Sequence, residues 1–384
     1  MVATSTSTSI NTSIQQLIDR QVEKGDQLGV QVSAYKDGEV IVDAVAGEMG
    51  PEDPRPVQLD TLFNCFSTTK GVAATAIHML ADRGKLDYQA PVTRYWPEFG
   101  QNGKDKITVE QALSHQGGVH AVPSPLTVEF VTEWQKGLDW IAGATPGWEP
   151  GTATGYHALT YGWIVGAIVQ GADGRHIKDF IREEIAQPLG VENEMFCGIP
   201  DGVEDRLATL QTLMATPEEL QVPPDHDFFK AMPQESEVNF DDIRVRKACL
   251  PAANGHFSAR ALARMYGALA NKGEIDGVRL VSSERVSNMG TMVTDAPDRV
   301  LLGLPLRKGI GFMLGGPIGP MKSVNGPRLN AFGHSGAGGS TAFADPDVGL
   351  GIAVTINKMQ NTLQAEGPTF EVCEAIREEL GVNG

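Results

Sequence analysis

The sequence predicts an α/β chain of the α+β type, in which one antiparallel sheet is flanked by terminal helices and interrupted by an inserted, mainly helical subdomain. Three observations lead to this prediction. Residues 29–46 form two apolar, β-branched runs joined by Lys-Asp-Gly, a strong hairpin signal. Strand character returns at 310–356, close to the other end of the chain. Between them, from about residue 86 to 300, apolar residues follow helical spacing.

The N-terminal part of the chain begins with a segment rich in Ser and Thr. Residues 1–12 lack the basic region and apolar core of a signal peptide, so we expect a short disordered tail. Residues 14–25 have the pattern of an amphipathic helix, and strands are expected near 29–36 and 39–46. We assign residues 13–85 to the sheet domain.

The middle of the chain, residues 86–304, is expected to form the helical domain. Helices are predicted at 108–114, 127–142, 157–170, 176–186 and 258–271. Ser258 is a candidate N-cap for the last of these helices. Residues 221–250 have no regular pattern, and an irregular loop of that length is uncommon unless it covers a site.

The C-terminal part, residues 305–384, returns to the sheet domain. Strands are expected near 310–314, 341–344 and 349–356. A helix at about 363–380 closes the chain.

Composition excludes several classes of function. The net charge of −17 repels phosphate backbones and anionic lipid, so we expect neither a nucleic-acid partner nor a membrane-surface role. The sequence contains no run of about 18 apolar residues, the length that a helix needs to span a membrane. The four cysteines are widely spaced without a C-x-x-C pair, which favours reduced thiols in a cytoplasmic protein. No spacing among the eight histidines indicates a metal, and we expect no cofactor; the oligomeric state stays open.

Ser67 and Lys70 are the first candidates for chemistry. A serine hydroxyl needs a base within hydrogen-bond reach, and residues three apart share one face of a helix. Residues 72–81 follow helical spacing, so Ser67 would stand at a helix N-terminus, where developing negative charge is favoured. The same Ser-x-x-Lys pattern at Ser33 and Lys36 falls on a predicted strand, where side chains three apart point to opposite faces. On local sequence alone, Ser67 could equally be an ordinary N-cap.

Two further segments bear on Ser67. The stiff loop at 146–151 leads to Tyr156, directly before an apolar helix, which would hold that tyrosine in one place. The run at 332–340 contains several glycines, which allow a ligand to approach the backbone closely.

With these three segments in order, the chain resembles the serine β-lactamase-like superfamily, most closely the branch shared by family VIII carboxylesterases and class C β-lactamases. That family arranges Ser-x-x-Lys, Tyr-x-Asn and Lys-Thr-Gly in this order. Here the three motifs are Ser67-Thr68-Thr69-Lys70, Tyr156-His157-Ala158 and His334-Ser335-Gly336. The resemblance implies the fold shared by β-lactamases and penicillin-binding proteins.

The resemblance also implies roles for individual residues. Ser67 would be the acyl-accepting nucleophile, and Lys70 with Tyr156 the proton-transfer pair. The backbone N–H groups of Ser67 and Ala337 would form the oxyanion hole. The substrate site would be lined by His334, Ser335, Gly336 and Ala158. A lysine cation about 4 Å away contributes about 4 kcal/mol, enough to lower the pKa of a tyrosine by about three units, so either Tyr156 or a neutral Lys70 could be the base.

Two departures from the family pattern point to the substrate. Ala158 replaces the asparagine whose amide holds a substrate amide, and His334 replaces a cationic lysine that attracts a carboxylate. Both losses matter less for a neutral ester, so we favour a carboxylesterase acting on small-molecule esters. An acyltransferase with the same acyl-enzyme, an amidase or β-lactamase, and a non-catalytic binding relative are the alternatives.

Overall fold

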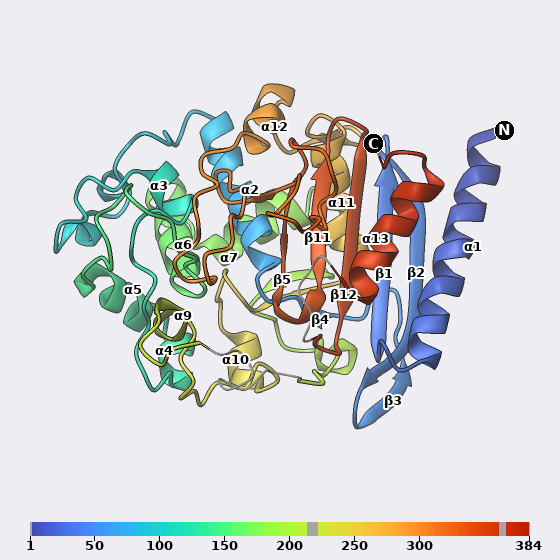
Figure 1. Ribbon diagram of the computed structural model, residues 1–384, viewed down its shortest axis with the longest axis horizontal. Coiled ribbons are helices and arrows are strands. Elements are labelled where there is room, and N and C mark those ends of the chain that lie inside the picture. The colour runs from blue at the N-terminus through green and yellow to red at the C-terminus, as the bar shows by residue number, and fades with distance from the viewer. Residues whose placement is uncertain (1, 213–221, 361–365, 384) are drawn as a thin grey trace.

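The structure, a computed structural model, describes residues 2–212, 222–360 and 366–383. Its central element is a seven-stranded sheet in the order β3-β2-β1-β12-β11-β10-β9, and every neighbouring pair is antiparallel (Figure 1). The strands are β1 (Gly29–Lys36), β2 (Glu39–Gly50), β3 (Asp53–Pro56), β9 (Met313–Leu314), β10 (Phe332–Ser335), β11 (Thr341–Asp345) and β12 (Leu350–Ile356). Strands from both ends of the chain therefore meet in one sheet, which confirms the predicted fold class.

Strand β1 lies inside the sheet, where it pairs with β2 on one side and with the central strand β12 on the other. Val32 lies opposite Ala44 in β2 and opposite Val354 in β12. Because successive side chains of a strand point to opposite faces, Val32 and Ser33 contribute to different layers of the core. The same alternation sends Ser33 and Lys36 to opposite faces.

One face of the sheet is covered by the two terminal helices, α1 (Val2–Glu23) and α13 (Pro368–Glu379), which run side by side (Figure 1). Helix α1 already begins at Val2. The expected disordered tail over 1–12 is therefore wrong, and the helix expected over 14–25 starts earlier. Ile10, one helical turn before Ile14, is only 1% exposed and extends the buried stripe of the helix toward the N-terminus.

The other face carries α2 (Thr69–Asp82) and α11 (Ala259–Ala270), and α6 (Thr160–Asp173) packs against α2. Helix α11 approaches β12 so closely that a Cβ on Gly351 would lie 2.5 Å from the Gly267 nitrogen. Ser258 caps α11 as expected, since its Oγ accepts a hydrogen bond from the Ala261 N–H at 3.1 Å.

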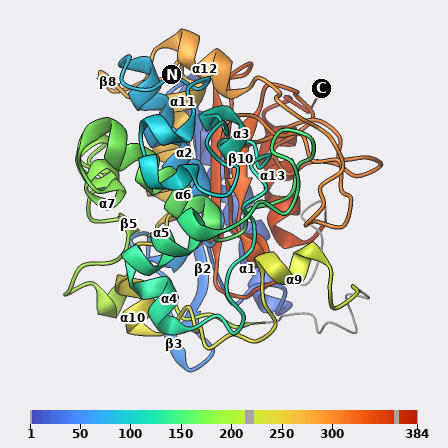
Figure 2. The ribbon, with the colours of Figure 1, turned by 90° about the vertical axis from the view of Figure 1, so that its left-hand side faces the viewer.

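The helical part of the chain lies beside this second face. Toward the viewer in Figure 2 are α6 and three shorter helices, α3 (Val109–Leu113), α4 (Val128–Thr132) and α5 (Trp134–Gly143). The predicted helix 127–142 is broken at Glu133, and 176–186 is an α-turn followed by a π-turn. The segment 222–250 contains two short helices. Residue 221 of the expected irregular loop 221–250 and residues 363–365 of the expected helix 363–380 lie outside the described residues.

The remaining elements are short. They are the α-helices α3 (Val109–Leu113), α4 (Val128–Thr132), α5 (Trp134–Gly143), α7 (Ile177–Phe180), α9 (Asp227–Ala231), α10 (Ile243–Lys247) and α12 (Ser283–Met289), the π-turn η3 (Ile181–Ala186), the 3-10 turns η1 (Val92–Arg94), η2 (Pro97–Gly100), η4 (Glu204–Arg206) and η5 (Ala337–Gly339), and the strands β4 (Phe63–Asn64), β5 (Met195–Cys197), β6 (Gly255–Phe257), β7 (Glu274–Ile275) and β8 (Val278–Arg279). Of the described helices, none is both long and apolar enough to cross a membrane.

The close packing of α11 on the sheet gives a stability prediction. Gly351→Ala should lower the free energy of unfolding by about 1–3 kcal/mol, because the new methyl group meets backbone that has to move. Gly143→Ala is the matched control: it lies at the exposed end of α5, where an added Cβ has no neighbour within 4 Å. Urea unfolding of both variants measures the difference, and equal midpoints would contradict the prediction.

Candidate active site

Ser67 lies in the tight turn that connects β4 to α2. Helix α2 begins at Thr69, and the Lys70 N–H donates to the Ser67 carbonyl oxygen at 3.0 Å. The preceding residue, Phe66, has φ +43°, a conformation that is rare for residues with a side chain and often found where a site imposes it. Ser67 is half-buried, whereas the residues around it are buried. The turn therefore presents the serine hydroxyl directly before the helix.

Lys70 projects from the first turn of α2 into the interior and is fully buried. Its Nζ lies 2.9 Å from Ser67 Oγ, 2.8 Å from the Ala158 carbonyl oxygen and 2.9 Å from the Ala252 carbonyl oxygen. Burial lowers the pKa of Lys70 well below its usual value, because the charged ammonium loses its hydration. The amine is thus held by three oxygen atoms from three separate segments of the chain.

Tyr156 lies in the irregular stretch before α6. Its ring is flanked by the imidazoles of His115 and His334, with ring centroids 4.9 and 6.0 Å away, and Lys70 Nζ lies 4.8 Å from its centroid. Burial raises the pKa of the Tyr156 phenol, and a hydrogen bond with the Ser67 side chain offsets part of that increase. The structure therefore brings Ser67, Lys70 and Tyr156 together.

Strand β10 ends beside the Ser67 turn. A Cβ on Gly336 would lie 2.2 Å from the Cys65 carbonyl oxygen, so only glycine allows this approach. The Thr68 hydroxyl donates to the Ser340 carbonyl oxygen at 3.2 Å and ties the two segments together. Ala337 opens the 3-10 turn that follows β10. Among the described residues, no acceptor takes the backbone N–H of Ser67 or of Ala337.

His334 is buried on β10, a strand that was not among those expected from the sequence. Its Nδ1–H donates to the Ser335 carbonyl oxygen at 2.8 Å, while its Nε2 is buried without a partner among the described residues. Burial lowers the pKa of His334 to about 3, so the imidazole is neutral at physiological pH. Ser335 Oγ is 2.8 Å from Thr341 Oγ1.

Ala158 belongs to an apolar wall on one side of Tyr156. Ala231 and Val300 are buried in the same cluster, with the partly buried side chains of Met232, Leu301 and Met313 packed around it. Ala231 comes from α9 in the segment 222–250, so part of that excursion does cover the site, as its length indicated.

Several residues at this site were not identified from the sequence. Ala252 contributes only a backbone oxygen, so no side-chain pattern could indicate it. Asp298 accepts the Tyr156 amide at 3.1 Å and pairs with Lys308 at 2.6 Å, although neither lies near a motif. His115 has φ +64°, and its Nδ1 accepts the His157 N–H at 3.1 Å.

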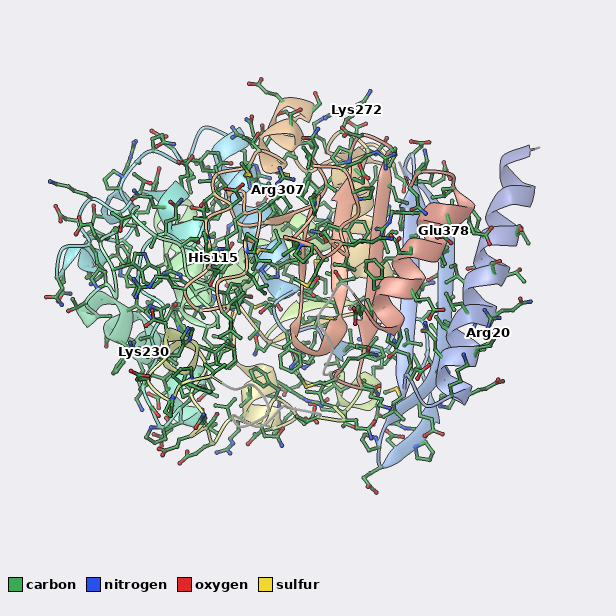
Figure 3. All side chains as sticks on the ribbon, in the orientation of Figure 1. Arg20, His115, Lys230, Lys272, Arg307 and Glu378 are labelled. Carbon is green, nitrogen blue, oxygen red and sulfur yellow. The ribbon has the colours of Figure 1, made fainter. Side chains whose placement is uncertain are left out.

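His115 also shows where the site lies in the molecule, far from the terminal helices α1 and α13 (Figure 3). In the part of the chain that the structure describes, no three His, Cys, Asp or Glu side chains form a cluster that could hold a metal ion.

Comparison with known proteins finds similar sequences over most of the chain. The family model described as Beta-lactamase matches residues 14–373. Among curated proteins, the esterase/beta-lactamase LipL of Mycobacterium tuberculosis is 35% identical over 350 residues, which cover 87% of this chain and 78% of LipL.

Two solved structures are similar over nearly the whole chain. A penicillin-binding protein homologue from Caulobacter crescentus superposes with a TM-score of 0.88 at 36% identity, covering 96% of this chain and 97% of the other. A family VIII carboxylesterase superposes with a TM-score of 0.86 at 32% identity, with the same coverage.

The buried histidines give a prediction for stability against pH. The pKa of His334 is about 3 in the folded protein and about 6.5 in the unfolded chain. In the folded protein the pKa values of His157 and His256 are also about 3, and that of His78 is about 4. Between these values the unfolded state binds more protons, so stability is complete above about pH 6.5 and is lost as the pH falls toward 3.

His334→Gln removes one of the side chains that take up a proton when the protein unfolds in this pH range. The slope of unfolding free energy between pH 5 and 6 should fall by about 1.4 kcal/mol per pH unit relative to wild type. Urea unfolding at several pH values in this window measures the slope, and most carboxylates remain ionised in both states there. An unchanged slope would mean that His334 is already protonated in the folded protein.

Proposed function

The chain belongs to the beta-lactamase family, and we propose that it is a serine hydrolase that cleaves carboxylic esters through an acyl-enzyme on Ser67. The observation that carries this proposal is the contact of Lys70 Nζ with Ser67 Oγ at 2.9 Å, beside the Tyr156 phenol. A nucleophile, a base and a second proton carrier within hydrogen-bond reach are the parts that acyl transfer requires.

The partners of Lys70 support its role as the general base. A neutral amine has two N–H groups and one lone pair. The carbonyl oxygens of Ala158 and Ala252 can only accept, so they take the two N–H groups. The lone pair then faces Ser67 Oγ and accepts the serine proton as the hydroxyl attacks the ester carbonyl. The lowered pKa of Lys70 favours this neutral form before the reaction.

Tyr156 acts as a neutral phenol that carries a proton between Ser67 and the leaving group. Its raised pKa disfavours the phenolate form, which would be needed if the tyrosine were the base. When the tetrahedral intermediate collapses, the phenol donates its proton to the departing alkoxide, and the Lys70 ammonium restores it. Water then attacks the acyl-Ser67 and repeats the proton transfers in the second half of the reaction.

The oxyanion of each tetrahedral intermediate is stabilised by the backbone N–H groups of Ser67 and Ala337. Both groups lack an acceptor among the described residues, and the fit of Gly336 against Cys65 holds their segments together. Preorganised donors of this kind stabilise charge that exists only in the transition state.

The lining of the site favours uncharged esters. His334 is neutral at physiological pH, so it offers no cation to a substrate carboxylate. Ala158 lies in an apolar cluster with Ala231 and Val300 and has no side-chain amide of its own to hold a substrate amide. Hydrolysis of a β-lactam ring is the second candidate, because the name of the relative LipL includes both activities. The same acyl-enzyme would also transfer its acyl group to an added alcohol or amine.

We also propose a cytoplasmic enzyme that acts on small-molecule esters and uses no metal or cofactor. The location rests on the four cysteines, which are all free thiols, although the Sγ atoms of Cys197 and Cys249 lie 3.4 Å apart.

Hydrolysis of p-nitrophenyl butyrate tests the proposed mechanism. Ser67→Ala should lower kcat/KM by about 10⁴-fold or more, because no nucleophile remains. Lys70→Met and Tyr156→Phe should each lower it by about 10²–10⁴-fold, the usual contribution of proton transfer. Ser33→Ala is the matched control, since Ser33 has the same Ser-x-x-Lys pattern on a strand and should keep full activity. Retention of activity by Ser67→Ala would exclude the mechanism.

The neutral lining gives a second test. His334→Lys places a cation where the family has one, so the ratio of cephalosporin to butyrate hydrolysis should rise by about tenfold or more. Hydrolysis of a chromogenic cephalosporin and of the butyrate ester, measured on the same preparations, gives this ratio. A wild-type enzyme that already hydrolyses both at similar rates would overturn the preference for esters.

A further inference from the structure

We propose that Asp298, held by a buried ion pair with Lys308, is a positioning residue that fixes Tyr156 in its place beside Ser67. The inference rests on the function proposed above and assigns a role to two residues outside the three motifs.

Asp298 is fully buried and uses both of its carboxylate oxygens. Its Oδ1 accepts the backbone N–H of Tyr156 at 3.1 Å. The same oxygen also accepts the backbone N–H groups of Val300 at 2.9 Å and Leu301 at 2.7 Å. Its Oδ2 accepts from Lys308 Nζ at 2.6 Å. One carboxylate thus joins the Tyr156 backbone to the loop that carries Val300, a member of the apolar wall.

Lys308 completes the connection from the opposite side. Its side chain is 1% exposed, and its Nζ also donates to Thr154 Oγ1 at 2.9 Å. The Thr154 carbonyl oxygen in turn accepts the Arg299 N–H at 2.9 Å. Residues 154–156 are therefore fastened to the 298–308 segment at both ends, by side chains and by backbone.

Tyr156 needs such anchoring because it belongs to no helix or strand. Helix α6 begins four residues later, at Thr160, and no side chain caps it. A catalytic phenol on irregular backbone has no ladder of hydrogen bonds to fix its position, and a displacement of about 1 Å can cost about 100-fold in rate. The amide hydrogen bond to Asp298 supplies the missing constraint.

Stability alone is a poor explanation of this ion pair. Removing two charges from water is costly, and buried pairs are often replaced by apolar residues without loss of stability. A pair that orients a catalytic group has a reason to be retained that does not depend on stability. The negative charge of Asp298 also raises the pKa of Tyr156, which keeps the phenol protonated for its role as a proton carrier.

Two double variants test the proposal. Both carry Lys308→Met, so that neither contains an unpaired buried charge. Asp298→Asn retains an oxygen that can accept the Tyr156 N–H, whereas Asp298→Ala does not. We expect the Asn variant to keep kcat for p-nitrophenyl butyrate within about threefold of wild type. The Ala variant should lose about 10–100-fold in kcat with KM changed by less than about threefold. Equal kcat values for the two double variants would overturn the proposal.

The same comparison in a Tyr156→Phe background separates positioning from general loss of structure. If Asp298 acts through Tyr156, the Asn-to-Ala difference should shrink to about twofold or less once the phenol is gone. A difference of the same size in both backgrounds would show that the loop is merely disrupted, and would also overturn the proposal.

A control pair lies elsewhere in the molecule. Arg377, which is 1% exposed, pairs with Glu374 at 2.6 Å on α13, the helix that carries the labelled Glu378, far from His115 (Figure 3). Arg377→Met with Glu374→Gln should leave kcat unchanged.

Failure of the proposed function would look different. A wild type without ester hydrolysis, or a Tyr156→Phe variant with full activity, would contradict the mechanism itself. In that case the rate of Ser67 phosphonylation by a p-nitrophenyl phosphonate becomes the measure of Asp298, with the same Asn and Ala variants and the same expected difference.

Discussion

The site depends on one constraint, the burial of the Lys70 amine among three oxygen atoms. In water this amine would be a cation, and a cation has no lone pair to accept the serine proton. Taking it out of water reverses that preference, and the two carbonyl oxygens of Ala158 and Ala252 leave only one direction free, toward Ser67. In the proposed mechanism, a side chain that is ordinarily an acid at neutral pH thus serves as the base.

The fold brings those three oxygen atoms together from separate parts of the chain. The carbonyl of Ala158 comes from the stretch before α6, that of Ala252 from the loop before β6, and Ser67 from the turn before α2. Helices α2 and α6 pack on each other, while β10 approaches the Ser67 turn at the distance that Gly336 allows. Burial of the amine therefore requires that segments 88 and 182 residues away from Lys70 in the sequence be held beside it.

The sequence predicted the parts of this arrangement that follow from local patterns. Strands at both ends, the capped helix after Ser258 and the Ser67-Lys70 pair all have periodic or motif signals. It could not predict Ala252, which acts through its backbone, or the pairing of Asp298 with Lys308, which depends on how two loops meet. The start of α1 was also missed, because the Ser- and Thr-rich residues before Ile10 have weak helix propensity and fold only as part of a longer packed helix.

The charges of the site, taken together, explain why esters are the preferred substrates. Burial favours the neutral form of all three groups, because it lowers the pKa values of Lys70 and His334 and raises the pKa of Tyr156. The ionised groups closest to the tyrosine backbone, Asp298 and Lys308, neutralise each other. In the proposed mechanism the oxyanion therefore forms together with the Lys70 ammonium, in surroundings of low dielectric where two N–H groups would act strongly on it. A substrate that brings its own carboxylate would have to bury a second negative charge there without a partner, which is costly.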